Sequence, residues 1–285
     1  MTSGYVLAIV GGSGLYDLDG LTDVERIDVD TPFGPPSDSI IRGRLGDTRL
    51  LFLPRHGRGH RIAPHQIDYR ANICAIKKLG ATHVVSISAV GSLREDIAPG
   101  DVVVVDQFVD LTRRRISTFF ENGIVGHVAF ADPVCRHVAS AVTAAAKLSG
   151  KVVHEGGTYV CIDGPQFSTR AESHLYRSWG MTVIGMTAMP EAKLAREAEL
   201  PYALLALATD YDCWRVSDDE VTVEAVVAVL RDNVNAARRM VTELAHTLPD
   251  PTRSVAHGAL ASAMMTDANS IPEGVRAKLD WLIPR

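Results

Sequence analysis

Residues 201–214 read PYALLALATDYDCW, and this stretch decides the fold. Its first eight residues are apolar apart from one tyrosine hydroxyl, a pattern typical of a buried strand in a parallel sheet. Asp210 and Asp212 follow at the end of this run. Because side chains alternate faces along an extended chain, we expect the two carboxylates to point the same way. Open α/β sheets bind ligands at the carboxyl ends of their strands, so the pair predicts a ligand site. The alternative is two ordinary surface acids where a strand turns into solvent.

Similar apolar runs alternate along the chain with helical patterns. Strands are predicted at residues 6–10, 50–53, 83–88, 102–105, 159–162, 183–186 and 202–208, and helices at 66–79, 133–148, 170–179, 190–199 and 222–244. This alternation predicts an α/β fold with a central mixed, mostly parallel sheet flanked by helices. No linker or repeat divides the chain, so residues 1–285 are expected to form a single domain, with residues 249–285 as a helical tail.

Composition narrows the function classes. The 285 residues carry a net charge of −5, which argues against a nucleic-acid partner, and the basic run Arg113-Arg114-Arg115 is interpreted as a solvated loop. No apolar stretch is long enough to span a membrane, and the chain opens on a strand-like run without a signal peptide, so a cytoplasmic location is expected. The four scattered cysteines form no CxxC pair, and no metal is expected.

Two loops that follow predicted strands carry anion-binding chemistry. Residues 11–14 read GGSG, whose free amides and hydroxyl could hold an anion or simply form a tight turn. The third glycine of a dinucleotide fingerprint is absent there. Residues 54–57 read PRHG, in which Arg55 offers a planar fork for phosphate and His56 a further donor. A solvated loop is the alternative for Arg55.

Three further loops could reach the same centre. Residues 88–92 could contribute backbone amides, and Thr187 could contribute a hydroxyl, although threonine more often satisfies its own backbone. Phe167, in the sequence GPQFS, could stack on a flat ligand, although an isolated phenylalanine is more often a core residue. Compact loops of this kind fit a small oxyanion and not a long polyanion.

Together these segments resemble one family, the trimeric purine nucleoside phosphorylases. The matching text is IVGGSGLYD, TPFGPPSD, RHGRGH, YRANICAIKKLGATHVV, AVGSLREDIAPGDVVVVDQFVD, GPQFSTRAES, GMTAMPEAKLAREA and ATDYDCW. The resemblance covers most of residues 6–245 and weakens in residues 112–127 and in the tail. It implies an enzyme that cleaves the N-glycosidic bond of a purine nucleoside with inorganic phosphate as co-substrate and no cofactor. It also implies a homotrimer or a dimer of trimers.

The resemblance also assigns roles to residues of this chain. Carried over by matching segment, the phosphate ligands would be Ser13, Arg55, His56 and Thr187, together with the amide of Ala89. Met186 would pack on the ribose, and Phe167 would face the purine. Asp212 would protonate N7 of the purine, and Asp210 would accept a hydrogen bond from a 6-amino group. A carboxylic acid could protonate N7 near neutral pH if burial at the strand end raised its pKa.

Three positions decide which nucleoside is expected. Ser168 and Asp210 stand where enzymes for 6-oxopurines carry glutamate and asparagine, which favours adenine because an ionised aspartate only accepts. Val226 stands where those enzymes carry a histidine for the 5′-hydroxyl, and with Val223 it suits an apolar methylthio group. His127 is expected to border this pocket from a neighbouring subunit. The predicted reaction is phosphorolysis of 5′-methylthioadenosine. The alternatives are phosphorolysis of adenosine, methylthioinosine or a 6-oxopurine nucleoside, or a non-catalytic nucleotide-binding module.

Overall fold

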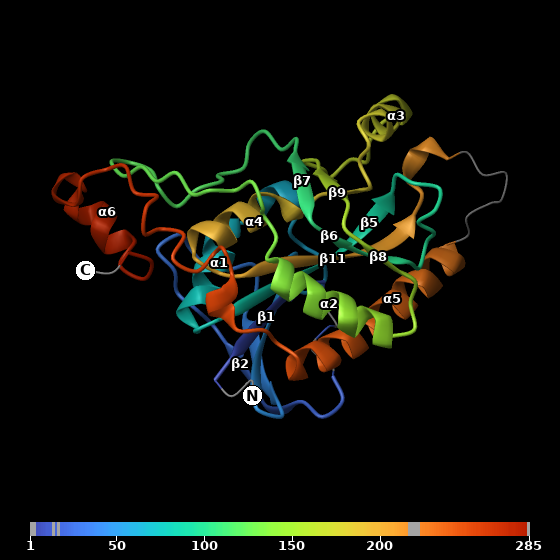
Figure 1. Cartoon of the computed structure of the whole chain (residues 1–285), viewed down its shortest axis with the longest axis horizontal. Helices are drawn as coiled ribbons and strands as arrows, with labels where there is room; N and C mark the ends of the chain where they lie inside the picture. Colours follow the sequence, from blue (N-terminus) through green and yellow to red (C-terminus); the bar gives the residue numbers. More distant parts are fainter. Residues whose placement is uncertain (1–3, 13–14, 16–17, 216–222, 284–285) are drawn as a thin grey trace.

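A twisted eleven-stranded sheet runs through the centre of the molecule (Figure 1). The computed structural model describes residues 4–12, 15, 18–215 and 223–283, with side chains from residue 231 onward in the last range. The strands are β1 Val6–Gly11, β2 Thr22–Ile27, β3 Ile40–Leu45, β4 Thr48–Pro54, β5 His83–Ser92, β6 Val102–Val105, β7 Gln107–Asp110, β8 Val153–Glu155, β9 Thr158–Cys161, β10 Val183–Gly185 and β11 Tyr202–Asp210. The main path runs β2-β3-β4-β1-β5-β10-β9-β7, while β11 pairs with β5 and β6, and β8 pairs with β6. Six of the ten pairings between described strands are parallel, which confirms the predicted mixed, mostly parallel sheet.

Helices cover both faces of this sheet. They are α1 Tyr69–Lys78, α2 Arg136–Leu148, α3 Arg170–Ser178, α4 Ala188–Glu197, α5 Val223–His246 and α6 Glu273–Lys278, and the first five confirm the predicted helices. α1 begins three residues later than predicted because Pro64–Gln66 forms a separate 3-10 turn and Asp68 caps the helix by accepting from the Ala71 amide at 2.9 Å. α1 and α4 pack on one face, and α2 and α5 pack on the other.

The central strands are buried on both faces, which explains their unbroken apolar runs. In β1, Val6, Ala8 and Val10 belong to the core under α1 and α4, whereas Leu7 and Ile9 belong to the core under α2 and α5. β11 alternates in the same way. The strands that the sequence did not predict, β2, β3, β7 and β8, lack this signal: β2 is almost entirely exposed, and β8 has three residues.

β5 is the strand at the centre of the candidate site. β11 pairs with it in parallel from Val84 to Gly91, and β1 pairs with it in parallel from His83 to Ser86. Its last two residues also pair with the antiparallel β10, through Gly91 with Ile184 and Ser92 with Val183. The strand therefore ends where loops from β1, β10 and β11 converge.

The tail folds back on the chain's own core. Leu279 and Leu282 are buried with the residues under α1 and α4, and the Trp281 ring packs edge-on against Phe119 at 5.0 Å. Besides α6, the tail contains the 3-10 turns Pro251–Arg253 and Ala268–Ser270, so much of it is turns and not helix. In the parts of the chain described by the structure, no helix is long and apolar enough to cross a lipid bilayer.

Candidate active site

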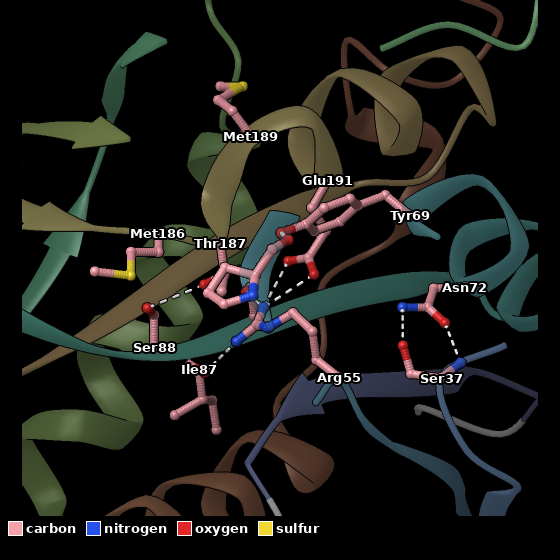
Figure 2. Close-up of polar contacts among 12 residues, drawn as sticks. Ser37, Arg55, Tyr69, Asn72, Ile87, Ser88, Met186, Thr187, Met189 and Glu191 are labelled. Atoms are coloured by element: carbon pink, nitrogen blue, oxygen red, sulfur yellow. Dashed lines mark hydrogen bonds and ion pairs between the residues drawn. The ribbon is translucent and has the colours of Figure 1, made fainter. Parts of the chain in front are cut away.

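Four chain segments meet where β5 ends. The Arg55 amide, just after β4, donates to the Gly11 carbonyl at the end of β1 at 2.9 Å. The Ser88 hydroxyl on β5 lies 3.3 Å from the hydroxyl of Thr187, the residue that precedes α4 (Figure 2). Both hydroxyls are nearly buried. The structure thus brings together the loops that the sequence assigned to an anion, and it adds Ser88, whose side chain the sequence argument did not use.

Arg55 is a buried ion-pair partner and not a solvated loop residue. Its side chain is 2% exposed, and Nη1 donates to Glu191 Oε2 at 2.9 Å and to Ser86 Oγ at 2.8 Å, while Nη2 donates to the Ile87 carbonyl at 2.8 Å. Figure 2 shows the guanidinium held between β5 and α4. Burial opposes its charge, but the Glu191 carboxylate prevails and raises the pKa of Arg55. The expected bidentate fork toward phosphate is therefore engaged by the protein itself, and Nε makes no hydrogen bond to the residues that the structure describes.

His56 presents an acceptor instead of the expected donor. Its Nδ1 lies 2.9 Å from the Ile62 carbonyl, which can only accept, so Nδ1 carries the proton. Burial and the adjacent Arg55 charge lower the pKa of His56 to about 4. The ring is consequently neutral at pH 7, and Nε2 offers a lone pair that suits a protonated phosphate oxygen.

The two acids come together next to Gly91, but by a different route from the one predicted. Asp210 ends β11 beyond a register shift after Ala208, and Asp212 begins the 3-10 turn η2 Asp212–Trp214 with a φ of 50°. The alternation of side chains along a strand is therefore not what brings the two carboxylates together. Asp210 Oδ1 accepts from the Asp212 amide at 2.8 Å, and a Cβ placed on Gly91 would lie 3.0 Å from Asp210 Oδ1 and 3.1 Å from Asp212 Cβ.

These acids are more accessible than the strand-end argument required. Asp210 is exposed and Asp212 is half-buried in the single chain, so the chain alone does not supply the burial that we expected around the acid. The Ser173 hydroxyl of α3 donates to Asp212 Oδ2 and fixes that carboxylate.

The loop before α3 lies against η2 and so adjoins the acids. The Cys213 thiol donates to the Ser168 carbonyl at 3.2 Å. Thr169 and Glu172 form a capping box that starts α3 directly after this loop. The Phe167 ring is 83% exposed, which excludes the alternative that it is a core residue. An exposed aromatic ring on a loop that contacts η2 can cover one face of a flat ligand.

Arg115 hydrogen-bonds to the backbone of two loops of this site, and the sequence argument missed it. It belongs to the run interpreted as solvated, but its side chain is 2% exposed. Nη1 donates to the Met186 carbonyl at 2.7 Å and to the Tyr69 hydroxyl at 2.9 Å, and Nη2 donates to the Asp163 carbonyl at 2.8 Å. Of these partners, Asp163 follows β9 and Met186 follows β10, so Arg115 ties together the segments after both strands. Met186 itself is half-buried.

Five other assigned residues are not brought into this centre by described side-chain contacts. Ser13 lies outside the described residues, as do the side chains of Val223 and Val226, although both valines belong to the backbone of α5. His127 is exposed, and its amide donates to the Ala263 carbonyl of the tail at 2.8 Å. Ala89 lies on β5 beside Ser88 and is exposed. In the described ranges no cluster of histidine, cysteine or acidic residues could hold a metal ion.

The whole chain is similar to one group of known proteins. A model of the phosphorylase superfamily matches residues 6–246. The chain is 52% identical over 279 residues to an S-methyl-5′-thioadenosine phosphorylase of Geobacter sulfurreducens, with 98% of each chain covered. It is 51% identical over 283 residues to a protein of the same name from Thermosynechococcus vestitus, again with 98% of each covered.

Solved structures agree. A methylthioadenosine phosphorylase from an antarctic soil metagenomic library matches with a TM-score of 0.94 and 44% identity over all of both chains. Methylthioadenosine phosphorylase from Schistosoma mansoni in complex with adenine matches with a TM-score of 0.85 and 36% identity, covering 92% of this chain and 99% of that one. The resemblance seen in the sequence is confirmed, and the chain belongs to the phosphorylase superfamily.

Proposed function

We infer that this protein is a pentosyltransferase that cleaves S-methyl-5′-thioadenosine with inorganic phosphate, giving adenine and 5-methylthioribose 1-phosphate. One observation carries the inference. Ser88 of β5 contacts Thr187, and Gly91, three residues later on β5, lies beside Asp210 and Asp212. We call the residues around Ser88 the first cluster and those around Gly91 the second cluster. Three residues of extended chain span about 10 Å, which is the scale of a nucleoside lying between an anion and a base-binding pair of acids. The names of the relatives agree with this assignment.

The first cluster is proposed to hold the nucleophile. The hydroxyls of Ser88 and Thr187, the amide of Ala89 and the lone pair of His56 Nε2 would bind hydrogen phosphate near the buried Arg55 charge. As the glycosidic bond lengthens, the sugar gains positive charge, and the phosphate next to it stabilises that charge before its oxygen bonds to C1′. Ser13 is assigned to the same role by its matching segment.

The second cluster is proposed to bind the leaving purine. The electron pair of the broken C1′–N9 bond moves into the purine, and a proton from Asp212 to N7 neutralises it. Asp210, when ionised, can accept from the 6-amino group of adenine and cannot donate to a 6-keto oxygen. Phe167 would cover the base and Ser168 would border it, whereas Met186 would pack on the ribose between the clusters. Val223 and Val226 are assigned to the methylthio group, and the reaction needs no cofactor besides phosphate as co-substrate.

The assembly is proposed to be a homotrimer or a dimer of trimers. An 83% exposed Phe167 and an exposed Asp210 leave the purine side of the site open in the single chain, where a neighbouring subunit would cover it. His127 of that neighbour is assigned to the border of the 5′ pocket. Light scattering during size-exclusion chromatography tests this proposal, and a monomer that is fully active would contradict it.

The reaction is tested by incubating the enzyme with methylthioadenosine, with and without phosphate, and separating the products by chromatography. We expect adenine and a sugar 1-phosphate only when phosphate is present. Adenine release that does not need phosphate would indicate a hydrolase, and no release would indicate a binding module. Adenosine belongs in the same panel because a structurally similar protein from Schistosoma mansoni is named adenosine/methylthioadenosine phosphorylase. An apolar 5′ pocket predicts roughly 10–200-fold lower kcat/KM for adenosine.

A further inference from the structure

The buried side chain of Tyr159 lies next to the proposed phosphate site, on its core side. Tyr159 of β9 is fully buried, and its hydroxyl lies 3.3 Å from Ser88 Oγ. The Thr187 amide points at the same hydroxyl from 3.4 Å. Tyr159 therefore contacts two of the residues assigned to phosphate, from the side that faces the core.

Gly185 makes room for this phenol. A Cβ on Gly185 would lie 1.9 Å from the Tyr159 hydroxyl oxygen and 2.6 Å from the ring carbon that bears it. Gly185 is not among the glycines with positive φ, so its backbone conformation does not require glycine. The close approach of Tyr159 supplies the reason for glycine at this position.

The contacts of the phenol determine where its proton goes. Burial raises the pKa of Tyr159 to about 12, so the hydroxyl keeps its proton at neutral pH. The Thr187 amide can only donate, and it therefore uses the lone pair of the phenol oxygen. The phenol proton is left to point at Ser88 Oγ. Because Ser88 accepts from the phenol, its own proton is directed away from Tyr159, toward the Ala89 carbonyl at 3.2 Å, the Thr187 hydroxyl at 3.3 Å or an anion.

We propose that Tyr159 is a positioning residue that sets the direction of the hydrogen bonds in the phosphate site. Tyr159 donates to Ser88 Oγ, which keeps the Ser88 proton from pointing into the core, and a bound anion can then take that proton in place of the Ala89 carbonyl at 3.2 Å. The unprotonated oxygens of the phosphate accept hydrogen bonds only, and a hydroxyl that pointed its proton into the core would instead repel them. The proposal rests on the proposed binding of phosphate at this site and goes beyond it by assigning a residue that does not touch the anion.

The test is Tyr159→Phe, which removes one oxygen and keeps the ring. We expect KM for phosphate to rise by about three- to tenfold, the usual weight of one hydrogen bond. KM for the nucleoside and kcat at saturating phosphate should change far less. The matched control is Thr48→Val, which also removes a buried hydroxyl, one that donates to the Ala245 carbonyl at 2.6 Å far along the sheet. This control should leave KM for phosphate unchanged.

A double-mutant cycle with Ser88→Ala tells whether Tyr159 acts through its hydrogen bond to Ser88 or by a general loosening of the loop. If Tyr159 acts through Ser88, Tyr159→Phe should add little to KM for phosphate once Ser88 has lost its hydroxyl. An equal effect of Tyr159→Phe in both backgrounds, or an unchanged KM for phosphate in the folded single variant, would overturn the proposal.

The phosphate-induced rise in Tm gives a readout that does not depend on turnover. We expect Tyr159→Phe to reduce this rise, whereas Thr48→Val should keep it even if its Tm without phosphate is lower. If the unmodified enzyme is stabilised by phosphate but releases no adenine, the proposed reaction fails while the role of Tyr159 is still decided by this shift. If Tyr159→Phe leaves the shift intact, the inference fails alone.

Discussion

At the scale of single residues, the Arg55–Glu191 pair links binding to stability. Both side chains are at most 2% exposed, and the Tyr202 hydroxyl also donates to Glu191 Oε1 at 3.0 Å. A residue that the sequence suggested as a phosphate ligand on a loop is therefore also part of the core. Its substitution should affect both properties.

We expect Arg55→Met to lower the free energy of unfolding by about 3–5 kcal/mol, because it leaves the Glu191 carboxylate buried without its cation. Urea denaturation measures this loss. The matched double variant Arg55→Met with Glu191→Gln should recover part of it, since no lone buried charge remains. A single variant as stable as the unmodified protein would show that water reaches Glu191 and that the pair is not structurally important.

The two acids near Gly91 should separate by kinetics. Asp212→Asn should lower kcat by roughly 10²–10⁴-fold because it removes the proposed proton donor. Asp210→Asn should instead weaken adenine recognition, and together with Ser168→Glu it should favour 6-oxopurine nucleosides. Steady-state kinetics on both nucleoside classes checks this, and equal small losses for both variants on every substrate would make the acids structural.

At the scale of elements, the loop between β7 and α2 holds the strand-end loops in place through one side chain. Arg115 donates to the Asp163 carbonyl after β9 and to the Met186 carbonyl after β10. Among the described contacts, these two carbonyls accept from no other charged side chain. Arg115→Lys keeps the charge but loses the planar fork. We expect kcat/KM to fall at least about tenfold, since loops that supply both substrate contacts would lose a shared anchor.

The neighbouring arginine provides the control for this variant. Arg114 is exposed, so Arg114→Lys should leave kcat/KM and Tm unchanged. Equal behaviour of the two variants would return the whole run to the solvated loop that its sequence suggested.

The elements also show why part of the fold could be predicted and part could not. β1 and β11 are buried on both faces, so each appears in the sequence as an unbroken apolar run. The helices are predicted because their buried faces leave a periodic apolar pattern in the local sequence. β2 is exposed, and its pairing with β3 is decided by the rest of the sheet, which leaves no periodic signal. The loops after the buried strands were correctly predicted to meet, because strand direction places them at one edge.

Partners within the site were harder to predict than its location. Arg115 and Arg114 are adjacent and chemically identical, yet one is buried and the other exposed. The only sequence signal for Glu191 was an acid in an otherwise apolar helix start. Tyr159 looked like an ordinary strand residue. Such distinctions arise from contacts between segments distant in sequence, which periodicity does not encode.

At the scale of the whole molecule, a buried histidine makes the fold sensitive to acid. His83 begins β5, is fully buried, and its Nε2 donates to the Pro249 carbonyl at 2.9 Å, which ties the sheet to the start of the tail. Burial lowers the pKa of His83 to about 4. The folded protein thus prefers the neutral ring at pH values where the unfolded chain takes up a proton.

The stabilisation from neutral His83 is present above the unfolded pKa of about 6.5 and is lost as pH falls toward 4. Between pH 7 and pH 5 we expect this residue to account for a loss of about 2 kcal/mol in the free energy of unfolding. His56 acts in the same direction. Denaturant titrations at the two pH values measure the loss, which should shrink in His83→Gln and persist in His174→Gln, a change at an exposed residue of α3. Identical pH dependence in all three proteins would contradict the assignment.

The close approach of Tyr159 to Gly185 has a consequence for how this sequence can change over evolutionary time. Any residue larger than glycine at position 185 collides with the phenol, so position 159 must lose its large ring before position 185 can gain a side chain. The two positions are 26 apart in sequence but should mutate in a fixed order. Among diverging lineages, we expect a tyrosine at 159 to occur with glycine at 185, and a side chain at 185 to occur with a small residue at 159.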